Sequence, residues 1–322
     1  MVRQSTKPTL EAIQAEMADV DYKVRKAAIK KMMRYYRKEA LEPLLGLLGD
    51  GRAIMRSQAV QAVRQLQDAR ALGPLLGLLA DKSASVRAQV AKALGSIGDP
   101  SVAPVLQRLL NDPNSGPRLA AALSLCTLRD PSSLPALLAY LEQAEDNALY
   151  PLAPALGNFD TPVVIEPLLA LCRRYASEHV AIWVSIGLSK LGASSTPILA
   201  QILIDQSRSA LERECVAVTF GRQSRPGTAL QLIQALSDSS AKVRRYAAWA
   251  LAGLQDPGAI EPLIQALADE DEQVCWQAIR ALTVLKATSA IDALTSCLSS
   301  KKAYVADTAA EALARLNALS LQ

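Results

Sequence analysis

The chain has 322 residues, half of them hydrophobic, and its 35 basic and 31 acidic side chains give a net charge of +4. Because only 4% of the residues are aromatic, leucine, alanine, valine and isoleucine make up the apolar mass, a composition that favours helices. A charge so close to balance does not require a polyanionic partner, and no apolar run approaches the roughly 18 to 20 residues of a membrane span. We therefore expect no membrane attachment, and nucleic acid is poorly supported as a partner.

The cysteines indicate a reducing compartment. They are five in number and widely spaced, and no two form a C-x-x-C pair. An oxidised framework or a zinc cluster therefore has little support. Because the N-terminal MVRQSTKPTLEAIQAEM also has no signal-peptide core, we expect a cytoplasmic protein.

The first predicted elements are a cap helix within residues 1–20 and a second helix within the basic run KVRKAAIKKMMRYYRK, residues 23–38. Much of the run fits a charged outer face, because terminal repeats need polar surfaces. Lys31 fits this less well, since Ala62 and Ala93 hold its phase in later repeats. The alternative is a docking patch for an anionic partner. Its members would be Lys30, Lys31, Arg34, Arg37 and Lys38.

From this point the sequence repeats with a period of 31 or 32 residues. Val86 in ASVRAQVAKALGSIGD marks the phase, and equivalent positions run from Val24 to Val305. Each period predicts two helices. Helix A follows the pattern V-x-x-x-[VA]-A-x-x-L, which forms one apolar stripe. Helix B begins near a proline, as in PLLGLL, where the missing N–H is harmless in the first turn.

Glycine recurs inside helix B as Gly46 and Gly77, 31 residues apart. Each should cost about 1 kcal/mol relative to alanine. Two explanations are open: neighbouring helices approach closely, or the surface is kept bare for a partner. We favour close packing. At the other end of the chain, residues 303–317 are predicted to form a capping helix with a polar outer face.

Neither helix can bury its stripe alone, but stacked pairs bury each other's stripes, so the pattern predicts an α-solenoid. The segments DKSASVRAQVAKALGSIGDPSVAPVLQRLL and DSSAKVRRYAAWALAGLQDPGAIEPLIQAL resemble HEAT repeats, and in particular the short bacterial repeats named after phycobilin lyases. The resemblance implies an all-α, right-handed solenoid of about ten antiparallel helix pairs that spans residues 1–322 as one domain. It also implies that the B helices line a concave surface.

In that family an Asp before helix A and an Arg after the marker position hydrogen-bond between neighbouring repeats. A guanidinium fork suits such an oxygen-lined turn, so the resemblance implies a structural ladder. The matching residues are Asp19, Arg25, Asp50, Arg56, Asp81, Arg87, Asp112, Arg118, Asp238 and Arg244, with Arg213 and Asp269 in the same phase.

The pattern breaks in the central repeats, about residues 140–192. Leu149 and Ala181 replace the ladder arginines, and Pro151 and Pro154 fall inside a predicted A helix, whose first turn should therefore be displaced or start late. Either the centre has drifted and its aromatics fill space, or it binds a partner. The candidate partner-binding residues are Tyr140, Tyr150, Glu166, Arg173, Arg174, Tyr175, His179 and Trp183.

Catalytic and metal sites are not indicated, because one histidine and dispersed cysteines supply neither a catalytic triad nor a metal cluster. We predict a non-catalytic scaffold or assembly factor that holds another protein on its concave surface and needs no cofactor. The resemblance supplies an alternative: a phycobilin lyase subunit or bilin-protein chaperone, acting on bilin–cysteine thioether bonds and paired with a second HEAT-repeat chain. A nucleic-acid-binding repeat protein ranks third.

Overall fold

The computed structural model describes residues 7–144 and 146–320, which contain twenty α-helices joined by turns and short 3₁₀ helices. The all-α class and the solenoid of about ten helix pairs are thereby confirmed. The α-helices are α1 Leu10–Met17, α2 Tyr22–Tyr35, α3 Leu41–Gly46, α4 Ala53–Leu66, α5 Leu72–Gly77, α6 Ala84–Ile97, α7 Ala103–Leu109, α8 Ser115–Leu128, α9 Leu134–Gln143, α10 Asp146–Leu156, α11 Ile165–Tyr175, α12 Glu178–Ser189, α13 Thr196–Ile204, α14 Ala210–Arg222, α15 Ala229–Ala235, α16 Ala241–Leu254, α17 Ile260–Gln265, α18 Glu272–Val284, α19 Ile291–Cys297 and α20 Ala303–Ser320.

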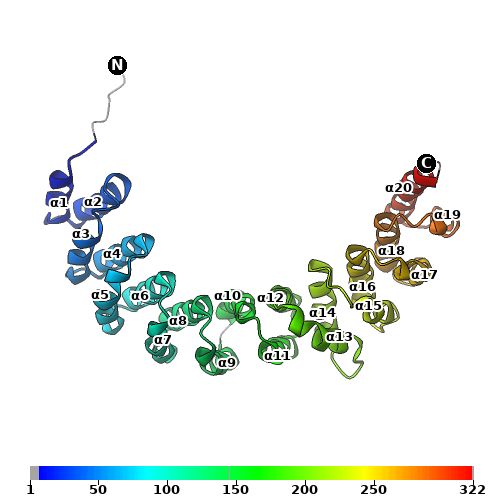
Figure 1. Ribbon diagram of the computed structural model, residues 1–322, viewed down its shortest axis with the longest axis horizontal. Coiled ribbons are helices and arrows are strands. Elements are labelled where there is room, and N and C mark those ends of the chain that lie inside the picture. The colour runs from blue at the N-terminus through cyan, green and yellow to red at the C-terminus, as the bar shows by residue number, and fades with distance from the viewer. Residues whose placement is uncertain (1–6, 145, 321–322) are drawn as a thin grey trace, which may run out of the picture. The chain divides into compact units, whose positions relative to one another are not determined.

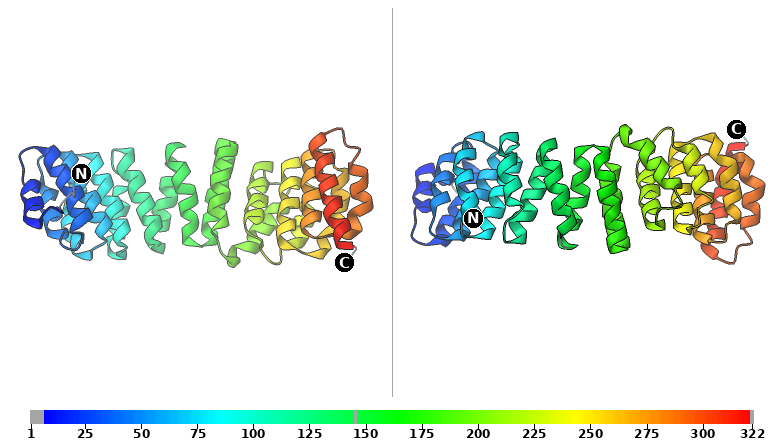
Figure 2. Two further views of the ribbon diagram at one scale, coloured as in Figure 1. Left: turned by 90° about the horizontal axis from the view of Figure 1, so that it is seen from above. Right: turned by 90° about the horizontal axis from the view of Figure 1, so that it is seen from below.

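The chain divides into two compact units, Met1–Ala148 (unit 1) and Leu149–Gln322 (unit 2). The division falls inside α10, within the central repeats where the pattern breaks. Within each unit the helices stand side by side with their axes across the stack (Figure 2). The arrangement of both units as one continuous domain stays a prediction.

The even-numbered helices from α2 to α20 carry the A pattern, and the odd-numbered helices from α3 to α19 carry the B pattern. Within unit 1, and separately within unit 2, the A helices lie on the inner side of the curve that the unit itself describes (Figure 1). The expectation that the B helices line the concave side is therefore wrong for both units. The exposed side of the A helices of unit 2 is called its inner face below.

Small residues at the contacts between A helices explain this direction of curvature. Ser124 Oγ donates a hydrogen bond to the Ala91 carbonyl oxygen at 2.9 Å, and a Cβ added to Gly95 would lie 2.5 Å from Ser124 Cβ. In unit 2, a Cβ added to Gly187 would lie 2.5 Å from the Ala153 carbonyl oxygen. Helices that approach this closely take the shorter, inner path of the stack.

Turns between A and B helices follow the sequence signals. Gly98 ends α6 with φ +82°, and the Asp99 side chain accepts a hydrogen bond from Ser101 N at 2.9 Å to start the next turn. Asp256 does the same for Gly258 N at 2.8 Å. These Asp turns set the direction of the B helices that follow them.

The helix α10 differs from its prediction. It begins at Asp146, ahead of Pro151 and Pro154, and both prolines lie inside it. Each proline removes only one backbone donor, and the buried Leu149 and Leu152 hold the helix against its neighbours. The expected late start is therefore wrong.

The recurrent glycines of helix B also differ from their prediction. Nothing lies within 4 Å of a Cβ added to Gly46 or Gly77, and both have ordinary helical backbone angles. Close packing is therefore not the reason for these glycines. They leave exposed, bare backbone on the B helices of unit 1.

Candidate functional site

The Arg–Asp contacts expected from the resemblance are present in the regular repeats. In most of them the arginine donates to the backbone carbonyl of the turn aspartate six residues earlier, as Arg56 does to Asp50 O at 2.8 Å. The same arginine also forms an ion pair with the carboxylate of the aspartate 25 residues later in the chain. The nitrogen–oxygen distances are 2.9 Å for Arg25–Asp50, 2.6 Å for Arg56–Asp81, and 2.7 Å for Arg87–Asp112, Arg213–Asp238 and Arg244–Asp269.

Two positions of the ladder depart from this scheme. Arg118 donates to the carbonyl oxygens of Asp112 and Pro113, and the position 25 residues later is Gln143. Arg213 donates to the Arg208 carbonyl instead of a turn aspartate. Its partner Asp238 has no exposed side-chain surface. Burial acts to raise the pKa of Asp238, but hydrogen bonds from Arg213, Ser240 N and Gln206 outweigh it, so the pKa is lowered.

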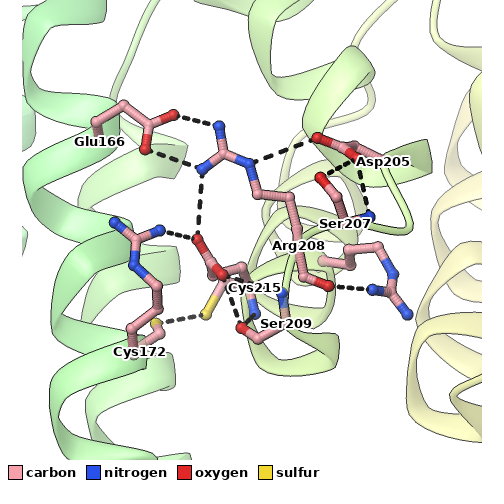
Figure 3. A network of polar contacts seen from close by, with 10 residues as sticks. Glu166, Cys172, Asp205, Ser207, Arg208, Ser209 and Cys215 are labelled. Carbon is pink, nitrogen blue, oxygen red and sulfur yellow. Dashed lines mark hydrogen bonds and ion pairs between the residues drawn. The ribbon is translucent and has the colours of Figure 1, made fainter.

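Between α11 and α14 a different network replaces the ladder (Figure 3). Arg208, in the turn before α14, donates to both carboxylate oxygens of Glu166 on α11, at 2.6 and 2.9 Å. The same guanidinium lies 3.4 Å from Glu212 Oε1 and 3.7 Å from Asp205 Oδ2. The hydrogen bonds from Arg208 lower the pKa of Glu166.

Glu212 is the buried centre of this network, although it occupies the position that a valine holds in other repeats. Its carboxylate accepts from Ser209 N at 3.1 Å while Ser209 Oγ accepts from Glu212 N, which makes a capping box at the start of α14. Arg173 on α11 also pairs with Glu212. A buried carboxylate is stable here because hydrogen bonds and two guanidinium groups compensate its charge.

A thiol pair lies beside this network, between α11 and α14 (Figure 3). The Sγ atoms of Cys172 and Cys215 are 3.2 Å apart, and both residues are buried. Contact with Cys172 and burial raise the pKa of the Cys215 thiol well above its usual range. The wide sequence spacing of these cysteines had hidden the pair.

The structure divides the predicted partner-binding residues among different surroundings. Glu166 and Arg173 belong to the Arg208 network, and the Arg174 guanidinium lies 5.0 Å from the centre of the Tyr175 ring. Tyr150 and Trp183 meet edge to face on α10 and α12, with ring centres 5.4 Å apart. His179 is exposed on α12, and Tyr140 lies in unit 1, where it lines a 220 Å³ cavity with Arg118 and Gln143.

The predicted anionic docking patch is partly occupied by internal contacts. Lys31 Nζ forms an ion pair with Glu16 Oε1 at 2.6 Å, which ties α2 to the cap helix α1. Arg37 donates to the Gln65 carbonyl oxygen, and Arg34 lies over the Tyr35 ring. Lys30 and Lys38 are exposed. The ion pair with Glu16 explains why Lys31 is charged at a position that alanine occupies in other repeats.

The inner face of unit 2 carries residues that sequence reasoning missed. Arg245 and Trp249 are four residues apart on α16 and lie opposite the buried stripe of Val243, Ala247 and Leu251. A groove of about 300 Å³ separates them from α18. Its lining consists of Arg245, Tyr246, Trp249, Gln273, Trp276, Gln277 and Arg280.

A second groove of about 370 Å³ adjoins the first between α18 and α20 and shares two of its residues, Trp276 and Arg280. The other lining residues are Thr283, Val284, Thr308, Glu311, Ala312 and Arg315. Contacts within the protein hold Trp276 and Arg280, the two residues that line both grooves. Trp276 Nε1 donates to Thr308 Oγ1 at 3.1 Å, and the Arg280 guanidinium lies 4.6 Å from the centre of the Trp276 ring.

Trp249 owes its position to a glycine on the neighbouring A helix. A Cβ added to Gly221 of α14 would lie 2.1 Å from Trp249 Cε3, so only glycine leaves room for the ring. Tyr246 meets Trp249 at 6.3 Å between ring centres. Trp249 nevertheless keeps 36% of its surface exposed. The ring is held in place and still accessible from solvent.

Elsewhere in unit 2, a cavity of about 710 Å³ lies beside the loop from α14 to α15. The buried Arg225 lines it, but its Nη2 already donates to the Leu188 and Leu191 carbonyls near the end of α12 at 3.3 and 2.6 Å. Burial lowers the pKa of Arg225. We interpret Arg225 as a cap for the carbonyl groups at the end of α12.

Stacked A and B helices with repeating Arg–Asp contacts define an α-solenoid repeat protein. A family model for HEAT repeats matches residues 10–91, 75–149 and 229–314, so the chain belongs to the HEAT-repeat family. No curated protein matches the sequence. The resemblance to phycobilin lyase repeats in particular stays a prediction.

Two solved structures of karyopherins share the fold. The structure of Kap121p bound to Nup53p has a TM-score of 0.62 and 16% identity over 96% of this chain and 42% of that chain. The structure describing Kap95p binding to RanGDP has a TM-score of 0.61 and 12% identity over 95% of this chain and 49% of that chain. The chain thus spans less than half the length of either karyopherin.

Neither a membrane-crossing helix nor a metal-binding group of side chains occurs in the part of the chain that the structure describes. Within residues 7–144 and 146–320, no helix is both long enough and apolar enough to cross a bilayer. The same residues do not bring three or more His, Cys, Asp or Glu side chains into a group that could hold a metal ion.

Proposed function

We propose that the protein is a non-catalytic scaffold that binds a partner protein on the inner face of unit 2. One observation carries the proposal: all three tryptophans, Trp183, Trp249 and Trp276, lie on A helices of this unit and are partly or well exposed. Tryptophan, tyrosine and arginine are the residues that dominate the binding energy of protein interfaces. The surface therefore has the composition of an interface core.

Its apolar exposure extends over several neighbouring helices. Tyr150 is 64% exposed on α10, Ile182 is 49% exposed on α12, and Tyr304 is 38% exposed on α20. Single exposed apolar residues are ordinary, but exposed apolar residues on α10, α12, α16, α18 and α20 together are typical of a binding surface. The proposal thus replaces the B-helix surface expected from the sequence with the A-helix surface.

The structural neighbours support protein binding as the general role. Both karyopherin structures concern binding of a protein partner, Nup53p in one and RanGDP in the other. Their similarity concerns the fold, so the partner of this chain has to be found by experiment.

Site-specific photo-crosslinking in the native cells tests the proposal. A photoreactive side chain at the exposed Gln273, on the inner face, should capture a discrete partner, whereas the same group at the exposed Gln265 of helix B α17 should not. Capture should be lost in a Trp249→Ala/Trp276→Ala variant whose thermal unfolding remains cooperative. Equal capture from both positions, or capture that survives the double substitution, would contradict the proposal.

A further inference from the structure

We infer that the two joined grooves between α16, α18 and α20 recognise an acidic peptide segment that inserts an apolar or aromatic side chain. This inference rests on the proposed function and adds the chemistry of the partner. It concerns the surface lined by Trp249, Trp276, Arg245, Arg280 and Arg315.

The charged side chains that line the two grooves are predominantly basic. The α16–α18 groove is lined by two arginines and no acidic residue, and the adjoining groove adds Arg315 with one acid, Glu311. Among the described residues, no carboxylate lies within ion-pair distance of these three arginines, although nearly every arginine of the ladder has one. Guanidinium groups that lie beside a groove without an ion pair to the described residues are complementary to the carboxylates of a ligand.

Contacts within the protein restrict several side chains of the grooves. Arg280 lies over the Trp276 ring and Arg245 lies 4.6 Å from the centre of the Tyr246 ring, so stacking restricts both guanidinium groups. Gln273 donates to the Tyr304 hydroxyl at 3.0 Å and so joins α18 to α20. A partner that binds here pays less conformational entropy than at a surface of mobile side chains.

The neighbouring charges favour a peptide over a nucleic acid. On the next A helices towards α12, Glu214 and Glu178 flank Lys242, which pairs with Glu178. Burial raises the pKa of Glu214. At the other end stand Glu311 and Asp307 of α20. A continuous phosphate backbone would meet these carboxylates, whereas a short acidic segment can place its charges on the arginines alone.

A binding assay with defined polymers tests the inference. The probe is a fluorescein-labelled random copolymer of glutamate and tyrosine, and binding is followed by anisotropy and by quenching of tryptophan fluorescence. An Arg245→Gln/Arg280→Gln variant should bind about tenfold more weakly. An Arg108→Gln/Arg129→Gln variant removes the same charge from exposed positions of unit 1 and should bind as the wild type does.

The wild-type chain alone provides a second measurement that does not depend on folding of the variants. Binding of the copolymer should weaken as salt is added, and a lysine–tyrosine copolymer should not bind. Equal binding of both copolymers, or tighter binding of a thymidine oligonucleotide, would overturn the inference. If acidic selectivity fails while cross-links from Gln273 persist, the partner chemistry is wrong and the scaffold proposal stands. If the cross-links from Gln273 are lost, both the scaffold proposal and the inferred partner chemistry are wrong.

Discussion

The A helices α6 of unit 1 and α18 of unit 2 are built on the same buried pattern but face solvent with different residues. Both bury a valine at their third residue, Val86 and Val274. Arg87 of α6 pairs with Asp112, and Asp269 in the turn before α18 pairs with Arg244 of α16. At the exposed positions two and six residues later, α6 has Ala88 and Lys92 where α18 has Trp276 and Arg280. The buried side chains and the Arg–Asp contacts, called the frame below, therefore hold each repeat together. The solvent-facing positions remain free to acquire a function.

The largest expected effect concerns the frame. Replacing Arg213 with methionine should destabilise the protein by about 3–5 kcal/mol, because Asp238 would keep a fully buried charge without its partner. Urea denaturation monitored by circular dichroism measures this loss. The exposed Arg70, which pairs with Asp68 two residues away, provides the control. A similar loss for Arg213→Met and Arg70→Met would show that burial does not set the strength of the frame.

A smaller effect, of opposite sign in the two units, is expected for glycine. Gly187→Ala in unit 2 should destabilise by about 1–3 kcal/mol, because the new Cβ would meet the Ala153 carbonyl oxygen at 2.5 Å. Gly77→Ala in unit 1 should stabilise by up to about 1 kcal/mol, because the position is helical and open.

Thermal unfolding of both glycine variants checks this difference. Destabilisation by Gly77→Ala would mean that the B helices of unit 1 pack more closely than the structure shows. If instead Gly77→Ala stabilises the chain but weakens partner capture, the bare backbone of unit 1 also contributes to binding.

The frame was largely predictable from the sequence because burial repeats with the helical period. The stripe of Val86, Val90 and Leu94 recurs every 31 or 32 residues and placed the A helices, and the proline of PLLGLL, which recurs with the same period, placed the B helices. The direction of curvature was predicted wrongly, because the resemblance implied that the B helices line the concave side, although Gly95 and Ser124 at the A–A contacts carry the opposite signal. The pattern of small residues within one helix does not reveal which helix of a pair lies on the concave side. That requires a comparison of the small residues on the A helices with those on the B helices.

The proposed site was predicted only in part, because breaks in the repeat were taken as its signal. The sequence prediction included Trp183 and Tyr150 but not Trp249 and Trp276, which lie in regular repeats at solvent-facing positions. The available signal was large aromatic residues opposite a buried stripe. Glu212 was also detectable, since a carboxylate at a position that is otherwise apolar requires buried partners.

Acidification should lower the stability of the protein by less than removal of a whole Arg–Asp pair does. Hydrogen bonds from Arg56 and Arg87 lower the pKa values of Asp81 and Asp112 in the folded protein. Because a lowered carboxyl pKa means that the unfolded chain binds protons more readily, this contribution is present above about pH 4 and is lost as the pH falls through the folded pKa.

Urea denaturation at a series of pH values below neutral measures this loss. An Asp112→Asn variant should be less stable at neutral pH but should lose less stability on acidification than the wild type. Asp307→Asn, at an exposed position without an arginine contact, should follow the wild-type curve. A wild-type stability that stays level down to pH 2 would contradict the role of the paired carboxylates.

The smallest expected effect concerns the network that replaces the ladder between α11 and α14. Arg208→Gln should cost no more than about 1 kcal/mol, because Arg208 is 25% exposed and Glu166 is 53% exposed, and solvent screens such a pair. Glu212 would keep Arg173 and its capping box, so α14 should begin at the same residue. The Glu166 pKa should rise towards its ordinary value once Arg208 is gone, which NMR titration of the carboxyl group can follow. A loss as large as that of Arg213→Met would instead show that the partly exposed network carries as much of the fold as the buried ladder, and that its side chains are not free to serve a partner.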